Sequence, residues 1–239
     1  MDLNLLNTIA KYLARFLTVI LVLSIHEFFH AFAAVKNGDL TPKFAGRYTL
    51  NPMKHFDPFG LVLFVLAGFG WAKPVPINPS NFRNYKKGLV WTSIAGVLAN
   101  FVMAFIGYAF VLLYGLVPVP NVAEANALIV LLYQVGFYVV QFFYVFNLAF
   151  CVFNLIPLYP LDGFRLWDAL DRKRGKVFQF VRSYGYYILM GLIIVHFFAD
   201  RIYLLSLIDI LGYLMTFAET LLGLPITLFW NFIFGFIYG

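Results

Sequence analysis

The fold of this chain is decided by residues 9–35, which read IAKYLARFLTVILVLSIHEFFHAFAAV. Three of these residues carry a formal charge, and one of them, Glu27, lies in the second half of the stretch. About 20 apolar residues, at about 1.5 Å of rise each, cross the hydrocarbon core of a bilayer, so the stretch predicts a transmembrane helix. We expect this helix to run from about Thr8 to Lys36 and to end at Asn37-Gly38-Asp39.

Two histidines and a carboxylate lie in one turn of this predicted helix. An ionised group at the centre of a membrane helix costs about 2.5–3.5 kcal/mol, so polar residues placed there need a function. His26 and His30 are four residues apart and share one face of the helix, where both imidazoles can bind one metal ion. Glu27 lies beside that face, where it can accept a proton from water activated by the metal. The pattern H-E-x-x-H is the signature of zinc hydrolases.

Three other interpretations of the motif compete with a metal site. A pair of core histidines on a soluble helix is disfavoured, because both histidines and Glu27 share one turn of a membrane-length apolar stretch. A signal peptide is suggested by Ala31-Phe32-Ala33, which is similar to a cleavage site, but a signal core would not carry two histidines and a glutamate. Chance occurrence of a short motif stands until a third ligand is found.

The composition places the whole chain in the membrane. Of 239 residues, 62% are hydrophobic, 20% aromatic and 12% charged, which is far from the averages of soluble proteins. We expect a single integral membrane domain over 1–239, with a catalytic core at about 8–170 and additional helices at about 184–239. Cys151 is the single cysteine, which excludes a disulfide framework and a cysteine-based zinc site.

The basic residues follow the topology of a membrane protein. Residues 36–87 hold eight Lys or Arg against two Asp, and residues 157–183 hold six against three. The loop at 118–126 holds none, and its only charged residue is Glu124. Because Lys and Arg accumulate in cytoplasmic loops, the two basic segments are predicted to be cytoplasmic, with the H-E-x-x-H motif toward that side. The net charge of +6 therefore reflects topology and does not indicate nucleic-acid binding.

Residues 40–88 contain six prolines and cannot form one long helix. Inside them, the apolar run that begins with LVLFVLA at 61–67 is too short to cross a bilayer. We expect a short re-entrant β-ribbon or loop over residues 61–71 that lines a pocket beside the first helix. Phe64 and Val65 of this ribbon are candidate substrate-binding residues. A helix lying on the membrane surface is the alternative.

Two further membrane helices are predicted at about 89–117 and 127–156. The first contains Gly96 and Asn100, which are four residues apart and share one face. A small residue allows close helix approach, and an amide in lipid needs a partner across the contact. Asn100 is therefore expected either to make a packing hydrogen bond or to line the pocket.

The second of these helices leads into the sequence NLIPLYPLDG at 154–163. Its two prolines break the helix and free backbone groups, which implies a covered cavity. The topology returns Asp162 to the same side of the membrane as His26 and His30, so Asp162 can be the third metal ligand. Gly163 permits a close backbone approach that other residues would hinder.

The C-terminal part of the chain predicts more membrane helices. A short helix is expected at about 164–171, followed by spans at 184–198 and 203–222, with the tail at 225–238 in the membrane interface. His196 is interpreted as a packing or interface residue. The predicted fold class is an all-α polytopic membrane protein with about five transmembrane helices, three of which form the catalytic core.

The two motifs together, H-E-x-x-H at 26–30 and N-x-x-P-x-x-P-L-D-G at 154–163, resemble those of the site-2 protease family of intramembrane zinc proteases. The likeness covers roughly residues 20–170 and looks like the short bacterial branch, without PDZ or nucleotide-binding CBS appendages. Family members carry A-G-P-x-x-N on the middle core helix, whereas this chain has Val97 in place of the proline and keeps Asn100. The helix kink at this position is therefore expected to differ.

The resemblance implies that His26, His30 and Asp162 hold one Zn²⁺ ion and that Glu27 is the general base. The charges agree, because two neutral imidazoles and one carboxylate leave a single positive charge on the site, which Glu27 cancels. The implied activity is hydrolysis of peptide bonds within transmembrane or signal-peptide segments in a bacterial cell membrane. The implied partners are such a substrate and the lipid bilayer.

A helical substrate must unwind before its peptide bonds can be cleaved. Asn154 is the candidate side chain to pair with the exposed substrate backbone, and the 61–71 ribbon could supply a strand edge. Two other functions remain open from the sequence: a metal-dependent membrane hydrolase with a non-peptide substrate, and a non-catalytic metal-binding membrane protein. Glu27 disfavours the second, since a structural metal site does not require it.

Overall fold

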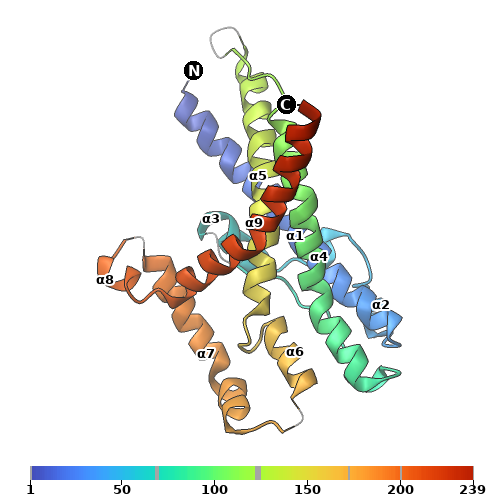
Figure 1. The fold of residues 1–239 in the computed structure, drawn as a ribbon. Coiled ribbons are helices and arrows are strands. Elements are labelled where there is room, and N and C mark those ends of the chain that lie inside the picture. Colours follow the sequence, from blue (N-terminus) through green and yellow to red (C-terminus); the bar gives the residue numbers. More distant parts are fainter. Residues whose placement is uncertain (1, 68–69, 122–124, 172, 200, 239) are drawn as a thin grey trace.

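The computed structural model describes residues 2–238 of the chain, apart from 68–69, 122–124, 172 and 200. The described residues form helices joined by loops, with one isolated antiparallel bridge between Phe56 and Ala72 and no sheet. In chain order the elements are α1 (Leu3–Lys36), α2 (Thr41–Phe44), η1 (Pro52–Lys54), α3 (Pro58–Ala67), η2 (Pro79–Asn81), α4 (Tyr85–Tyr114), α5 (Ala127–Leu155), α6 (Asp162–Leu170), α7 (Lys176–Ala199), α8 (Tyr203–Ser206) and α9 (Ile210–Tyr238) (Figure 1).

Five of the described helices, α1, α4, α5, α7 and α9, are long and apolar enough to cross a membrane. They contain between 24 and 34 residues each. A span needs about 20 residues, so each helix is long enough even when tilted. The predicted all-α, multi-pass membrane protein is confirmed.

The first helix begins earlier than predicted because Asp2 caps it. The Asp2 carboxylate accepts hydrogen bonds from the backbone N–H groups of Asn4 and Leu5, at 3.0 and 3.2 Å. These N–H groups have no partner within the helix, so the cap extends α1 to Leu3. At the other end α1 stops at Lys36 as predicted, and Gly38 beyond it adopts a φ of 109°, which favours glycine.

α1, α4 and α5 pack against one another and form the predicted three-helix core (Figure 1). Small residues occupy the closest contacts between them. A Cβ atom added to Gly107 of α4 would lie 3.0 Å from the ring of Phe143 in α5. Ala104 of α4 is fully buried in a cluster with Leu148 of α5. Because lipid offers little hydrophobic driving force between helices, such close backbone packing stabilises the bundle.

The predicted β-ribbon at 61–71 is wrong, since its first seven residues belong to helix α3. The Asp57 carboxylate accepts hydrogen bonds from two N–H groups of the first turn, at 3.0 and 3.1 Å, and Pro58 takes the first helical position. Asp followed by Pro is a helix-start signal. The apolar run behind this signal has no period of its own and so does not distinguish helix from strand. Residues 68–69 of the predicted ribbon lie outside the described residues.

α3 is held between α1 and α5. Phe64 is 7% exposed, packs on Val19 of α1, and places its ring centroid 5.3 Å from that of Phe146 in α5. The guanidinium of Arg15 donates a hydrogen bond of 3.0 Å to the carbonyl oxygen of Val65. This carbonyl is near the carboxyl end of α3, where a cation is favourable for the helix dipole. Phe64 and Val65 therefore fix α3 in place.

The C-terminal helix α9 is continuous over Ile210–Tyr238, so the fifth span is present but the predicted bounds 203–222 and the separate interfacial tail at 225–238 are wrong. Pro225 lies inside α9, where it removes one helix hydrogen bond. The next residue, Ile226, is 1% exposed against α4 and α5. Trp230 donates its indole N–H to a backbone carbonyl of α4 at 2.7 Å. These contacts, made by residues that follow Pro225, offset the lost bond.

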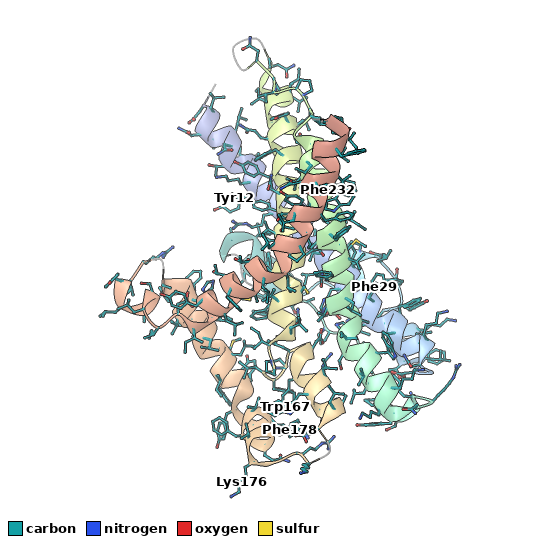
Figure 2. The ribbon with its side chains drawn as sticks, viewed as in Figure 1. Tyr12, Phe29, Trp167, Lys176, Phe178 and Phe232 are labelled. Carbon is teal, nitrogen blue, oxygen red and sulfur yellow. The ribbon has the colours of Figure 1, made fainter. Side chains whose placement is uncertain are left out.

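Aromatic packing joins α6 to α7 (Figure 2). Phe178 of α7 is 1% exposed, and its ring stacks on that of Phe164 with a centroid distance of 5.1 Å. The ring of Trp167 lies edge-on to Phe178 at 5.3 Å. Since α6 packs against α4 and α5 in turn, this cluster connects α7 to the core.

We predict that Phe178→Ala lowers the free energy of unfolding by about 3–5 kcal/mol, because it leaves a cavity between α6 and α7. Phe180→Ala is the matched control, since Phe180 is 55% exposed on the same helix. Unfolding of the two purified variants in the same detergent measures the difference. Equal stability of the two variants would contradict the assigned packing.

Candidate metal centre

Three side chains from α1 and α6 meet at one buried point. The Nε2 atoms of His26 and His30 lie 2.9 Å apart. The Oδ2 atom of Asp162 lies 3.2 Å from Nε2 of His26 and 2.9 Å from Nε2 of His30. The three residues are between 3% and 5% exposed. Among the described residues, they are the group whose donor atoms are placed to hold a metal ion.

The hydrogen bonds on the far side of each imidazole determine which nitrogen carries the proton. Nδ1 of His26 lies 2.5 Å from the Oδ1 atom of Asn100, and Nδ1 of His30 lies 2.6 Å from the carbonyl oxygen of Thr92. Both partners are oxygen atoms that accept, so each Nδ1 donates its N–H. Each Nε2 atom therefore presents a lone pair toward Asp162.

The donor set fits a zinc ion. Two lone pairs from nitrogen and one from a carboxylate oxygen point at the same place, where a bound metal cation would stabilise them. The Oδ2 atom of Asp162 is buried and has no hydrogen-bond donor among the described residues. Ligands on a tetrahedral zinc ion lie about 3.3 Å apart, close to the three distances between these atoms. Three protein ligands leave a fourth position open, as in catalytic zinc sites.

Gly96 makes room for the two histidines. A Cβ atom at this position of α4 would lie 2.5 Å from Nε2 of His30 and 2.7 Å from Cε1 of His26. Any larger residue would therefore push α4 away from α1 or displace the imidazoles. The sequence predicted close helix approach at Gly96, and the structure shows that the approach is to the ligands themselves.

Asp162 reaches the histidines because α6 folds back on the end of α5. Asp162 is the first residue of α6, where a carboxylate is favourable for the helix dipole. A Cβ atom on Gly163 would lie 2.3 Å from the carbonyl oxygen of Leu155 and 2.5 Å from that of Ile156. Glycine is therefore required for this close return. Arg165, one turn further on, places Nη1 3.5 Å from Oδ1 of Asp162.

Glu27 is held beside the three ligands by a backbone group from the following loop. Its Oε2 atom accepts a hydrogen bond of 2.9 Å from the N–H of Val75. Val75 lies in an extended segment, residues 73–78, which runs from the Phe56–Ala72 bridge toward the start of η2. One oxygen of Glu27 is thus oriented by the protein.

Asp39 fixes the far end of this extended segment and was not identified as important from the sequence. Its fully buried carboxylate accepts hydrogen bonds from Thr41, from the side chain of Asn81 and from the N–H of Asn78. Burial by itself raises the pKa of Asp39, but the bonds from Thr41, Asn81 and Asn78 outweigh it and lower this pKa. The carboxylate therefore stays ionised and binds residues 78–81 to the end of α1. The sequence signal for this role was the position of Asp39 directly after Asn37-Gly38, at the end of the first helix.

A cavity of about 230 Å³ lies beside residues that contact the ligands and Glu27. It is lined by residues of the extended segment, of η2, of the N-terminal part of α4 and of α6, namely Val75, Ile77, Pro79, Leu89, Thr92, Ser93 and Arg165. Thr92 links the cavity to the site, because its carbonyl oxygen holds His30. The hydroxyl of Thr92 is buried without a hydrogen-bond partner among the described residues.

The predictions for the candidate substrate-binding residues differ in how they compare with the structure. Asn100 bonds to His26 in α1 and to Asn147 in α5, which is the hydrogen bond across helix contacts that the first alternative expected, and it is not among the residues that line the cavity. Its role toward a substrate stays a prediction. Asn154 donates to the carbonyl oxygen of Phe150 in its own helix at 3.0 Å, and its role toward a substrate stays a prediction. Phe64 and Val65 do not offer a strand edge, because they lie in helix α3.

His196 and Cys151 have the structural roles expected of them. Nδ1 of His196 lies 2.8 Å from Oδ2 of Asp209, so these two residues connect α7 to the start of α9. The sequence had shown no partner pattern for either one. Cys151 is free and 2% exposed in α5, as a small buried apolar residue would be.

Comparison with known proteins agrees with this geometry. Residues 14–196 match the model of peptidase family M50. The chain belongs to this family. It is 39% identical over 183 residues to YwhC of Bacillus subtilis (strain 168), a candidate zinc metalloprotease, which covers 74% of this chain and 78% of YwhC.

A second relative is the candidate zinc metalloprotease Rip2 of Mycolicibacterium smegmatis (strain ATCC 700084 / mc(2)155). The identity is 28% over 194 residues, which covers 77% of this chain and 69% of Rip2. No solved structure matches the chain significantly. The M50 match confirms the resemblance to the site-2 protease family, and the chain is a multi-pass membrane protein of a zinc metalloprotease family.

We predict that Gly96→Ala lowers zinc occupancy sharply, because its methyl group would overlap the histidine rings. Gly191→Ala is the control, since a Cβ atom at Gly191 of α7 meets no atom within 4 Å. Elemental analysis of both purified variants measures the zinc content. Wild-type zinc content in Gly96→Ala would mean that α4 does not approach the ligands as closely as described.

Proposed function

We propose that this protein is an intramembrane zinc endopeptidase that hydrolyses peptide bonds within transmembrane or signal-peptide segments. The observation that carries the proposal is the convergence of three lone pairs, from His26, His30 and Asp162, at a buried point between membrane-length helices. Membership of peptidase family M50 supports the same reaction. On this proposal residues 1–239 form one integral membrane peptidase domain.

His26, His30 and Asp162 would hold the zinc ion. When bound there, zinc would polarise the scissile carbonyl group and acidify water. Glu27 is the group that takes the proton from the attacking water, and it returns that proton to the leaving amide nitrogen. The bond from Val75 orients one carboxylate oxygen of Glu27 and leaves the other oxygen for this proton.

The charge balance suits a site among apolar helices. Two neutral imidazoles add no charge, and the carboxylates of Asp162 and Glu27 together cancel the two positive charges of Zn²⁺. A neutral cluster avoids the large cost of an uncompensated charge away from water. Arg165 adds one positive charge at the edge of the cluster, where its side chain is 41% exposed.

The location of the site supports a membrane-embedded substrate. A helical segment has its carbonyl groups in hydrogen bonds, so it must unwind before hydrolysis. The cavity lined by Thr92 and Arg165, which contact His30 and Asp162, offers room for a substrate side chain. Asn154 remains our candidate for pairing with the unwound backbone. The basic loops at 36–87 and 157–183 support a cytoplasmic location of the site in a bacterial cell membrane.

We predict that the purified protein holds about one zinc ion per chain, and that His30→Ala and Asp162→Ala each lose it, since two ligands cannot replace three. Inductively coupled plasma mass spectrometry measures the zinc content. Asp168→Ala, a change of another α6 carboxylate that pairs with Arg174, is the control and should keep the ion. Full zinc content in Asp162→Ala would rule out Asp162 as a ligand.

We predict that Glu27→Gln keeps the zinc ion and the fold but loses cleavage, because an amide cannot take the proton from water. The amide oxygen can still accept the Val75 bond, so the loop should stay in place. Cleavage of a transmembrane peptide is followed over time, with a lipid ester as the alternative substrate. If the wild-type protein hydrolyses the lipid ester and not the peptide, the non-peptide alternative is favoured. If Glu27→Gln cleaves the peptide at the wild-type rate, another residue is the base.

A further inference from the structure

A chain of hydrogen bonds runs from His26 across three helices. Nδ1 of His26 in α1 bonds to Oδ1 of Asn100 in α4 at 2.5 Å. The Nδ2 group of Asn100 donates to Oδ1 of Asn147 in α5 at 2.7 Å. The Nδ2 group of Asn147 donates to the carbonyl oxygen of Phe143 at 2.8 Å. Asn100 and Asn147 are both 0% exposed.

The last hydrogen bond of this series determines which group donates and which accepts in each of the others. The carbonyl oxygen of Phe143 can only accept, so Asn147 must turn its NH₂ group toward it. The oxygen of Asn147 then faces Asn100, which must present its own NH₂ group. The oxygen of Asn100 is left to face Nδ1 of His26, which must therefore carry the proton.

Without Asn147, the orientation of the Asn100 amide would be undetermined. The two ends of an amide have nearly the same shape, so packing alone does not decide which end of Asn100 faces the histidine. If the NH₂ group of Asn100 faced Nδ1, the imidazole proton would move to Nε2. Nε2 would then lack the lone pair that a metal ligand needs.

We infer that Asn147 is a positioning residue that fixes the metal-binding tautomer of His26 through Asn100. This inference rests on the proposed zinc site but adds a residue of α5 that touches neither the ligands nor the cavity. All three core helices are then needed to prepare His26: α1 carries the ring, α4 carries the amide that bonds to it, and α5 sets the orientation of that amide.

The test compares two replacements of Asn147 that have nearly the same shape. Asn147→Leu removes the acceptor, whereas Asn147→Asp keeps a carboxyl oxygen that accepts from Asn100. Gln134→Leu, which removes another amide of α5, is the control for the loss of a polar group from this helix. Competition with a zinc chelator measures the affinity of each purified protein in detergent. Nitrogen NMR of ¹⁵N-labelled histidine measures the tautomer of His26, with His26→Ala to assign the signal.

The expected result is a loss of about 10–100-fold in zinc affinity for Asn147→Leu, as for other groups that orient metal ligands. In the same variant the NMR signal of His26 should show a population with the proton on Nε2. Asn147→Asp and Gln134→Leu should both stay close to the wild type. Asn147→Asp keeps the test decisive even if Asn147→Leu does not fold.

Two results would overturn the inference. The first is wild-type zinc affinity and an unchanged His26 tautomer in folded Asn147→Leu. The second is a loss of zinc affinity in Asn147→Asp as large as the loss in Asn147→Leu. If Asn147→Leu does not fold, a loss of zinc affinity of about tenfold or more in Asn147→Asp overturns the inference. Neither readout requires peptide cleavage, so failure to find a cleaved substrate affects the proposed function and leaves this result intact.

Discussion

The structure depends on bringing three lone pairs together in a place where water cannot screen them. His26 and His30 approach Asp162 to within 3.2 Å. α4 must come close enough that only glycine fits at position 96, and α6 must return close enough that only glycine fits at position 163. The approach of α4 and α6 to the ligands therefore depends on these two glycines.

The hydrogen bonds that start at the two metal-site imidazoles end on backbone carbonyls. The imidazole of His30 bonds directly to the carbonyl oxygen of Thr92, while that of His26 reaches the carbonyl oxygen of Phe143 through two asparagine side chains. A carbonyl accepts and never donates, so each series of bonds has a fixed direction. A buried amide would otherwise leave groups unsatisfied at a cost of about 1–3 kcal/mol each. In this series the same hydrogen bonds satisfy the buried amide groups and set the orientation of the imidazoles.

The loop after α1 positions the proposed base. Asp39 holds residues 78–81 against the end of α1, and the Phe56–Ala72 bridge holds the start of the extended segment. Val75, between these two attachments, meets Glu27. α3 lies in the same loop before this segment, and Arg15 and Phe64 fix it against α1 and α5. A segment with six prolines is thus rigid where it meets the site.

The sequence by itself predicted the membrane class, the membrane-length helices and the pairing of His26 with His30, because apolar length and a spacing of four residues are local properties. Asp162 lies far along the chain from them and was predicted only from the topology and the family resemblance, and helix packing brings it to the histidines. The sequence did not determine α3, since a run that is apolar on every side has no period, nor the continuity of α9, where packing of Ile226 and Trp230 overrides Pro225. The partners of Asn100 and Glu27 were also decided only by tertiary structure. Asn147 and Val75 are 47 and 48 residues away from them in the chain. The packing of α4 on α5 brings Asn147 to Asn100, and the folding of the loop after α1 brings Val75 to Glu27.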